Sequence, residues 1–190
     1  MGYAYTGVNG GMILLSAADP GMHSSSNEQD NRHYARLAKI PMVEPSDSQE
    51  AKDMVKTALE LSEDFDTPVL MRMTTRVCHS RSLVEEGEIL PQPHKHYEKN
   101  LAKFDLVPAV SRQRRLAVEE RLQKLSAYSE TTPLNFEIWN TDKIGVITSG
   151  ISFQYAQEVF GETASYLKLG FTYPLPEKKI RAFADKVETL

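Results

Sequence analysis

Cysteine is almost absent from this sequence, which has one, Cys78, among its 190 residues. A single thiol excludes an internal disulfide framework. It is also too few for a zinc ribbon or a self-contained iron–sulfur cluster site, each of which needs several thiolates. A chain so poor in cysteine is typical of a reducing compartment, so we expect it in the cytoplasm.

Long apolar runs are absent too. Runs such as Met12–Leu15 have the length of a strand, whereas a membrane span needs roughly 18–20 consecutive apolar residues. The first residues lack the basic segment and apolar core of a secretory signal. Positive charge is not in excess, because the formal net charge is -4. We therefore expect neither nucleic acid nor an anionic membrane among its partners.

The sequence nevertheless has the composition of a globular protein, with 41% apolar and 25% charged residues. An apolar run over residues 10–18 ends at turn-forming residues and predicts a buried strand in a parallel sheet. A capping-box pattern at Ser46–Gln49 begins a helix that we expect to end near Asp64, and Pro68–Met73 predicts the next strand. Strand, helix and strand in alternation predict an α/β fold with helices on the faces of a sheet.

A second α/β pattern begins near residue 133, after an irregular connector and a helix. The helix is expected over residues 111–126, with three leucines as its apolar anchors, Leu116, Leu122 and Leu125. Strands are expected at residues 144–148 and 166–169, each followed by a helix. The whole chain is therefore predicted to be α/β.

Charge is distributed unevenly along the chain. Residues 44–66 are acidic on balance, and residues 95–124 are basic on balance. Two interpretations are open: both regions are solvated helix faces, or they dock on one another or on a partner subunit.

The most unusual segment, residues 19–32, follows the carboxyl end of the first expected strand, where ligands bind in open α/β sheets. It contains an imidazole, three hydroxyls, carboxylates and a guanidinium. Such a loop can hydrogen-bond a polar substrate or cofactor, and His23 is a candidate general base near neutral pH. The alternative is a surface loop in which Asp30 or Asn31 caps the next helix.

Arg76 is a second candidate, because it follows Thr74 and Thr75 at the carboxyl end of the strand expected at Pro68–Met73. A guanidinium at this place can bind a carboxylate or a phosphate. The alternative role for Arg76 is a surface ion pair.

Three other patterns carry weaker signals. His94 and His96 have no third ligand at the spacing that a metal site needs, so no metal ligands are expected in this chain. The glycine-rich residues 7–11 precede a strand, whereas a phosphate-binding loop follows one. Ser149 and Gly150 lie at a strand-to-helix turn, where ordinary helix capping is the expected role.

Several stretches of the sequence closely resemble the alpha subunits of indolepyruvate:ferredoxin oxidoreductases, within the 2-oxoacid:ferredoxin oxidoreductase family. They follow the family's order and cover essentially the whole chain: residues 5–11, 18–25, 27–32, 40–47, 74–80, 147–151, 167–170 and 173–177. The block from His23-Ser24-Ser25 to Asn31-Arg32 is quite specific, whereas the other stretches are shared with related 2-oxoacid:ferredoxin oxidoreductases.

The resemblance implies two partial domains. Residues 1–88 would be the latter part of a pyrimidine-type thiamine diphosphate-binding domain, which is Rossmann-like. Residues 133–190 would be the first part of a transketolase C-terminal-like α/β domain, with residues 89–132 as a connector that contains a helix. We accordingly expect an internal fragment of a longer protein.

The resemblance also implies an activity, the oxidative decarboxylation of indolepyruvate and other aryl pyruvates to aryl-acetyl-CoA with ferredoxin as electron acceptor. The parent enzyme uses thiamine diphosphate, Mg²⁺ and iron–sulfur clusters. Its partners are the rest of the alpha subunit, the beta subunit, ferredoxin, coenzyme A and the aryl pyruvate. The diphosphate, magnesium and cluster sites are expected outside this chain, which is therefore expected to be inactive alone. The rival hypothesis is a free-standing α/β accessory or binding module without catalytic activity.

The resemblance carries over a set of candidates that would lie close to substrate or cofactor: His23, Ser24, Ser25, Glu28, Gln29 and Arg32, with Arg76 in addition. None of them is assigned a catalytic role, and no metal ligand is assigned.

Overall fold

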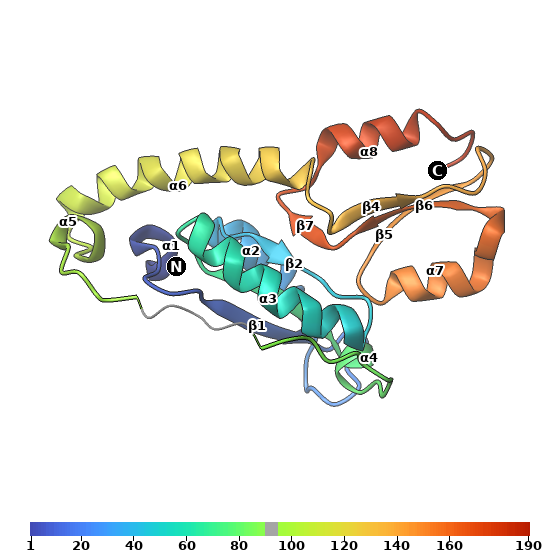
Figure 1. Ribbon diagram of the computed structural model, residues 1–190, viewed down its shortest axis with the longest axis horizontal. Helices are drawn as coiled ribbons and strands as arrows, with labels where there is room; N and C mark the ends of the chain where they lie inside the picture. The colour runs from blue at the N-terminus through green and yellow to red at the C-terminus, as the bar shows by residue number, and fades with distance from the viewer. Residues whose placement is uncertain (90–94) are drawn as a thin grey trace.

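The computed structural model describes residues 1–89 and 95–190; residues 90–94, which include His94, lie outside the description. The chain folds into two α/β units, each built on its own sheet. Figure 1 shows the first unit in blue and green and the second in orange and red. The long helix α6 (Pro108–Ser129) runs along the first unit toward the second.

The first sheet is mostly parallel, in the strand order β1-β3-β2-β7. Its strands are β1 (Ile13–Ala18), β2 (Met42–Val43), β3 (Val69–Thr74) and β7 (Phe171–Tyr173). β1 and β2 both pair with β3 in parallel, and β7 pairs with β2 in antiparallel orientation. The expected parallel pairing is confirmed for β1, β2 and β3, whereas the sheet as a whole is mixed. Its fourth strand comes from the far end of the chain, which the sequence pattern did not indicate.

Helix α3 (Ser48–Asp64) covers one face of this sheet and confirms the expected helix. Asp47 is its N-cap: Asp47 Oδ1 accepts the Glu50 backbone N–H at 2.8 Å, while the Glu50 carboxylate accepts the Ser46 N–H at 2.8 Å. The capping box therefore begins at Asp47 rather than at Ser46. The buried face of the helix packs on the strands through an apolar cluster that includes Met54, Ala58, Leu61, Val43, Val69 and Met71.

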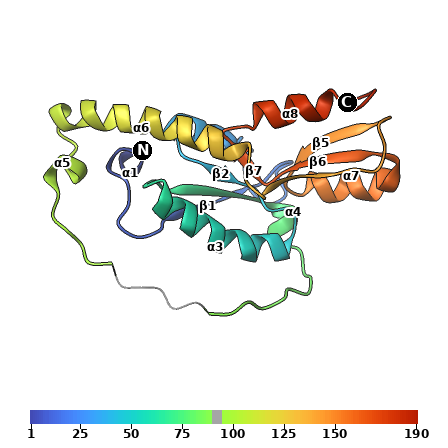
Figure 2. The same ribbon diagram turned by 45° about the horizontal axis from the view of Figure 1, so that its top comes forward.

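The opposite face is covered by two shorter helices, α1 (Gly2–Thr6) and α2 (Arg32–Ala38). A second apolar cluster lies between these helices and the strands, formed by Ala4, Ala35, Ile40, Met42 and Leu70. Successive side chains of a strand point to opposite faces, so Leu70 joins this cluster while Val69 joins the first. Figure 2 shows α3 on one side of the strands of this sheet. A single-turn helix, α4 (Thr75–Cys78), follows β3, and another, α5 (Leu101–Phe104), precedes α6.

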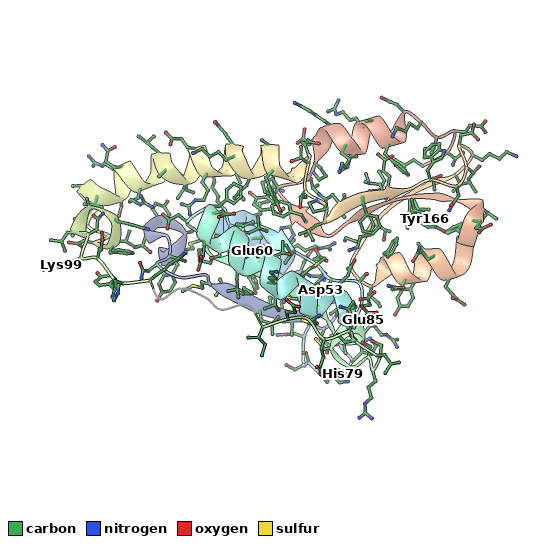
Figure 3. All side chains as sticks on the ribbon, in the orientation of Figure 1. Asp53, Glu60, His79, Glu85, Lys99 and Tyr166 are labelled. Carbon is green, nitrogen blue, oxygen red and sulfur yellow. The ribbon has the colours of Figure 1, made fainter. Side chains whose placement is uncertain are left out.

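The second sheet has the order β4-β6-β5, with β4 at Asn135–Ile138, β5 at Gly145–Ser149 and β6 at Ser165–Leu169. β5 and β6 are parallel, and β4 is antiparallel to β6. Helix α7 (Ser152–Phe160) packs on one face of the sheet near Tyr166, which Figure 3 labels, and α8 (Glu177–Ala184) packs on the other. A short 3-10 helix, Gly161–Thr163, precedes β6. The expected strands at 144–148 and 166–169 are confirmed within one residue.

Gly170 joins the two sheets. β6 ends at Leu169 in the second sheet and β7 begins at Phe171 in the first. The Gly170 N–H donates to the Leu134 carbonyl at 2.9 Å, and the Gly170 carbonyl accepts the Glu44 N–H at 2.8 Å. A Cβ at this position would lie 2.7 Å from the Leu134 carbonyl oxygen, so the close passage requires glycine. This close passage of the chain helps to determine how the two units are placed relative to each other.

The expectation that the first strand is buried is wrong. β1 is an edge strand, which among the described strands pairs only with β3. Leu14 and Leu15 are 42% and 67% exposed. An apolar run does not reveal whether a strand lies on each side of it, because the pattern reports side chains and not backbone pairing. The free edge presents backbone groups that favour the addition of another strand.

Helix α6 confirms the helix expected over residues 111–126 and extends it at both ends. Of its expected anchors only Leu125 is fully buried, and Leu116 is 60% exposed. Arg121 is buried instead, and its guanidinium donates to the carbonyls of Ala4 and Asp66 at 2.8 and 2.7 Å. The helix thus holds the N-terminal segment through polar contacts that apolar periodicity does not show. In the part of the chain that the structure describes, no helix is long and apolar enough to cross a membrane.

The acidic and basic regions contact each other. Lys103 Nζ lies 2.8 Å from the Asp66 carboxylate, and the Arg114 guanidinium lies 3.5 Å from the same group. Lys95 pairs with Glu63. Of the two interpretations left open by the sequence, docking between the regions is therefore observed at these residues.

Candidate functional site

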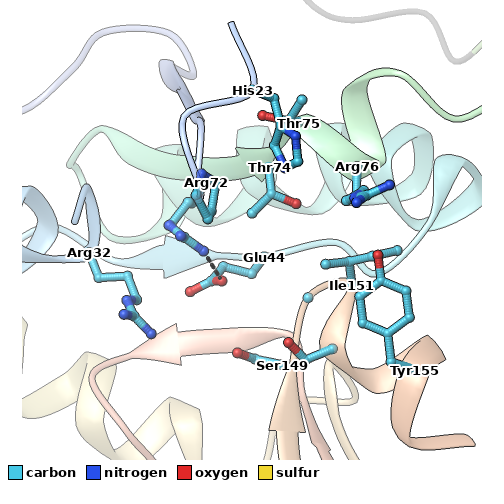
Figure 4. Close-up of a pocket in the computed structure, with 13 residues that line it drawn as sticks. His23, Arg32, Glu44, Arg72, Thr74, Thr75, Arg76, Ser149, Ile151 and Tyr155 are labelled. Carbon is cyan, nitrogen blue, oxygen red and sulfur yellow. Dashed lines mark hydrogen bonds and ion pairs between the residues drawn. The ribbon is translucent and has the colours of Figure 1, made fainter. Parts of the chain in front are cut away.

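A cleft of about 640 Å³ is lined by residues of both units. The first unit contributes the carboxyl ends of β1 and β3, and the second contributes the turn between β5 and α7. Figure 4 shows His23, Thr74 and Arg76 on one side of it and Ser149 and Tyr155 on the other. The carboxyl ends of parallel strands are the place where α/β sheets bind ligands. The cleft is therefore the candidate site.

A buried ion pair lies in the cleft. Arg72 Nη1 is 2.8 Å from Glu44 Oε2, and the Arg72 and Glu44 side chains are nine-tenths or more buried. The Thr172 hydroxyl donates to the other Glu44 oxygen at 3.0 Å. Glu44 therefore neutralises Arg72 and fixes its guanidinium, at the end of β2.

Two buried polar atoms of the cleft have no hydrogen-bond partner among the described residues: Arg72 Nε and Thr74 Oγ1. A buried donor left without an acceptor costs about 1–3 kcal/mol. Both atoms belong to residues that line the cleft, and a ligand that accepts hydrogen bonds can satisfy them if it approaches closely enough. This observation points to an anionic or carbonyl-bearing ligand.

Arg32 and Arg76 are the other guanidinium groups that line the cleft. Arg32 is bound to Asp30 by two hydrogen bonds of 2.8 Å, which lower the pKa of Asp30 to about 2. Arg76 forms no ion pair with any residue that the structure describes. Since Glu44 neutralises Arg72 and Asp30 neutralises Arg32, Arg76 supplies the uncompensated positive charge of the cleft.

The loop after β1 is closed by Asp19. Asp19 Oδ2 accepts the backbone N–H groups of Ser24 and Ser25, each at 2.8 Å, and the Thr75 hydroxyl donates to Asp19 Oδ1 at 2.5 Å. These bonds, led by the one from Thr75, hold the pKa of Asp19 well below its usual range. The carboxylate thereby attaches the loop to the start of α4 and places His23 at the cleft.

A second cavity, of about 630 Å³, shares Arg32, Glu44 and Ser149 with the cleft. Tyr173 and Leu175 line it as well, and burial raises the pKa of the Tyr173 phenol. Glu44 therefore stands at the boundary between two adjoining cavities.

Comparison with known proteins gives a consistent result, although no protein-family model matches the chain. The chain is similar to proteins named indolepyruvate oxidoreductase subunit IorA. It is 46% identical to that of Methanothermobacter marburgensis over 99% of this chain and 31% of the relative. It is 39% identical to that of Pyrococcus horikoshii, over 99% of this chain and 31% of the relative. It is 37% identical to that of Archaeoglobus fulgidus, over 98% of this chain and 31% of the relative. The resemblance to indolepyruvate oxidoreductase is confirmed.

The chain spans about a third of the length of these indolepyruvate oxidoreductase subunits. The similarity runs through both α/β units, because it covers nearly all of the 190 residues. The cleft between the units therefore lies wholly within the similar region.

The structure brings together four of the residues carried over from indolepyruvate oxidoreductases. His23, Arg32 and Arg76 line the cleft. Ser24 lines an adjoining cavity of about 480 Å³ together with His23, Arg76 and His79. The imidazole of His79 was not among the candidates.

The other three carried-over residues, Ser25, Glu28 and Gln29, are exposed and line none of these cavities. The Glu28 carboxylate accepts the Gly21 N–H at 3.0 Å, and the Ser25 N–H donates to Asp19. In this structure these two residues order the loop.

Sequence reasoning missed several residues of the cleft, chiefly Glu44, Arg72, Ile151 and Tyr155. Arg72 falls inside a strand, where the pattern predicted only sheet structure. Ile151 lies in a turn and Tyr155 in the helix that follows it, and the only role expected for this region was helix capping and packing. One sequence feature could have identified these two residues: their turn follows the carboxyl end of a parallel strand, β5.

The described residues do not fit the magnesium–diphosphate end of thiamine diphosphate. Within residues 1–89 and 95–190 no three His, Cys, Asp or Glu side chains are placed to hold a metal ion together, and Mg²⁺ prefers oxygen ligands. The carboxylate that lines the cleft, Glu44, is already bound to Arg72 and Thr172. The cleft fits a ligand that bears a carboxylate better than it fits a metal–diphosphate group.

Proposed function

We propose that the chain contributes the 2-oxoacid-binding part of an indolepyruvate:ferredoxin oxidoreductase. The whole enzyme would decarboxylate indolepyruvate and other aryl pyruvates oxidatively to aryl-acetyl-CoA, with ferredoxin as electron acceptor. The similarity to indolepyruvate oxidoreductase subunits supports the reaction class. The observation that carries the proposal is the cleft itself, where Arg76 has no ion-pair partner among the described residues and two buried donors have no acceptor.

In this proposal the chain supplies parts of two domains, and the rest of the enzyme supplies most of the cofactor-binding residues. Residues 1–88 and 133–190 correspond in it to partial pyrimidine-type and transketolase C-terminal-like domains, joined by residues 89–132. Thiamine diphosphate with Mg²⁺ and the iron–sulfur clusters would be held mainly by residues outside this chain. The partners would be the rest of the alpha subunit, the beta subunit, ferredoxin and coenzyme A.

The residues of the cleft would bind and orient the carboxylate of the 2-oxoacid. Arg76 can donate two parallel N–H groups to a carboxylate, and such charge-assisted pairs are stronger than neutral hydrogen bonds. Arg72 Nε and Thr74 Oγ1 offer further donors. The carboxylate is the group that decarboxylation removes, so its position determines which bond is presented for cleavage.

The alternative is a free-standing α/β binding module without catalytic activity. Such a module needs no further strands, and its sheets would be complete. β1 is an edge strand, and its Leu14 and Leu15 side chains face solvent. Because the strands of a parallel sheet are normally covered on both faces, this exposure favours the first proposal.

Binding of a stable substrate analogue tests the proposal. Indole-3-lactate keeps the indole ring and the carboxylate and carries a hydroxyl in place of the oxo group. We expect the chain to bind it in isothermal titration calorimetry and Arg76→Gln to weaken binding roughly tenfold or more, since hydrogen bonds to charged groups are worth about 1.5–3 kcal/mol.

Arg112→Gln is the matched control, because Arg112 is an exposed residue of α6 that does not line the cleft. This variant should bind the analogue as the unmodified chain does. Equal weakening by both substitutions, or no binding to the unmodified chain, would contradict the proposal. Supplied with thiamine diphosphate, coenzyme A, indolepyruvate and ferredoxin, the chain alone should leave ferredoxin oxidised.

A further inference from the structure

The side of the cleft formed by the second unit carries two large side chains with apolar surface, Ile151 and Tyr155, among smaller ones. Ile151 is the N-cap residue of α7, and Tyr155 follows it by four positions, so both lie on one face of the helix. Both residues line the cleft, and Figure 4 shows them on the side opposite Thr74 and Arg76. The part of the cleft near Arg76 therefore has two large side chains with apolar surface facing a cation, while Ser149 and Ser152 make the rest of this side polar.

Tyr155 is not part of the core of its own unit. Helix α7 packs on the second sheet through Phe153, whose ring makes edge contacts with Phe136 and Tyr166 at centroid distances of 6.2 and 6.1 Å. Tyr155 keeps 51% of its surface exposed. A half-exposed aromatic ring in the lining of a cleft offers its face to a ligand.

Helix α7 is held in place relative to the first unit. Gln154, next to Tyr155, donates from its side-chain amide to the Asp47 carboxylate at 3.0 Å, and the same amide lies 3.4 Å from the Ser46 hydroxyl. Asp47 is the N-cap of α3 in the first unit. These bonds across the units hold the first turn of α7, and with it the backbone of Tyr155, close to the first unit.

We propose that Tyr155, supported by Ile151, binds the aryl ring of the substrate and determines the specificity of the site. This inference rests on the proposed function, in which Arg76 binds the carboxylate. A ligand with a carboxylate and a flat apolar ring contacts both Arg76 and these two side chains, whereas a short aliphatic 2-oxoacid contacts only Arg76. The site thereby prefers aryl over short aliphatic 2-oxoacids.

The test compares two acids that differ in the ring, indole-3-lactate and lactate, by NMR titration of the chain and its variants. Tyr155→Ala should weaken binding of indole-3-lactate about tenfold, because stacking and burial of the ring are lost, and should leave lactate binding unchanged. Tyr155→Phe keeps the ring and should stay within about twofold of the unmodified chain for both acids. Val159→Ala is the matched control, since Val159 is on the same helix, 74% exposed, and does not line the cleft.

The outcomes separate this inference from the proposed function. Loss of binding of both acids in Arg76→Gln, with an unchanged preference for the aryl acid in Tyr155→Ala, would keep the proposed function and overturn the role of Tyr155. Binding that is insensitive to Arg76→Gln, or no binding of either acid, would overturn the proposed function and with it the subsite. An equal effect of Tyr155→Ala and Val159→Ala would show a general effect on α7 and also overturn the role of Tyr155.

Discussion

Lys168 and Glu50 form an ion pair between the two units. Lys168 Nζ lies 2.5 Å from Glu50 Oε1 and 2.6 Å from Oε2. Lys168 belongs to β6 and its side chain is completely buried, while Glu50 lies in the first turn of α3. The ammonium also lies 5.6 Å from the centre of the Phe136 ring. The pair attaches the second sheet to the helix that covers the first.

Removal of Glu50 should destabilise the protein more than removal of Lys168. Glu50→Gln leaves a buried ammonium without its counter-ion, and breaking a buried pair in this way costs about 3–5 kcal/mol. Lys168→Met removes the buried charge itself, and Glu50 keeps its hydrogen bonds to the Ser46 N–H and hydroxyl at 2.8 and 2.9 Å. Urea unfolding of each variant measures the two free energies of unfolding. The double variant should be more stable than Glu50→Gln; a Lys168→Met variant as unstable as Glu50→Gln would contradict this.

Gly170→Ala should destabilise the protein by about 1–3 kcal/mol through overpacking. The new methyl group would lie 2.7 Å from the Leu134 carbonyl and 2.9 Å from Met54 Cε, at the point where the chain passes from one sheet to the other. Gly10→Ala is the control, because nothing lies within 4 Å of a Cβ at that position. Thermal unfolding of both variants compares them, and equal melting temperatures would show that the passage at Gly170 tolerates a side chain.

The pKa of Asp30 should depend on Arg32. The Arg32 side chain lowers that pKa to about 2 by hydrogen bonding to the carboxylate. In Arg32→Gln we expect it to rise toward the usual aspartate value of about 4, as measured by carbon-13 NMR of the carboxyl group. Because the pKa is lower in the folded state than in the unfolded state, the pair stabilises the fold above about pH 4, and this contribution is lost as the pH falls toward 2. An unchanged Asp30 titration in the variant would contradict the pairing.

Leu15→Lys should reduce self-association of the chain with little effect on its stability. Leu15 is an exposed apolar residue on the edge strand β1, and charged side chains on edge strands oppose pairing between molecules. Leu37→Lys is the control, since Leu37 is 66% exposed on α2 rather than at a sheet edge. Sedimentation velocity over a range of protein concentrations measures the difference. An equal effect of both substitutions would assign association to general hydrophobicity rather than to the edge.

Helix α3 and the parallel strands β1 and β3 followed from local patterns. The apolar spacing of α3, with its capping box, predicted a helix that the structure shows at Ser48–Asp64. The run at residues 10–18 and Pro68–Met73 predicted β1 and β3, which pair in parallel. These features depend on residues close together in the sequence, where side-chain periodicity and capping act directly.

The motif match likewise indicated part of the lining of the cleft. His23 and Arg76 were candidates from their positions after strands, Arg32 was a candidate from the resemblance, and all three line the cleft. Ser25, Glu28 and Gln29 belong to the same motif but line none of the described cavities. A loop motif indicates which segment lies near the cleft. The direction of each side chain depends in addition on hydrogen bonds within the loop, such as those that Asp19 accepts from Ser24 and Ser25.

The sequence by itself determined the α/β class, the parallel pairing of the early strands and the loop that borders the cleft. Only the tertiary structure decided that β1 is an edge, that β7 joins the first sheet and that Tyr155 faces the arginines. The physical reason is that these three features depend on contacts between residues far apart in the sequence, such as Val43 with Phe171, or on a neighbouring strand being absent from the described chain. Neither kind of information is present in the local periodicity of one sequence.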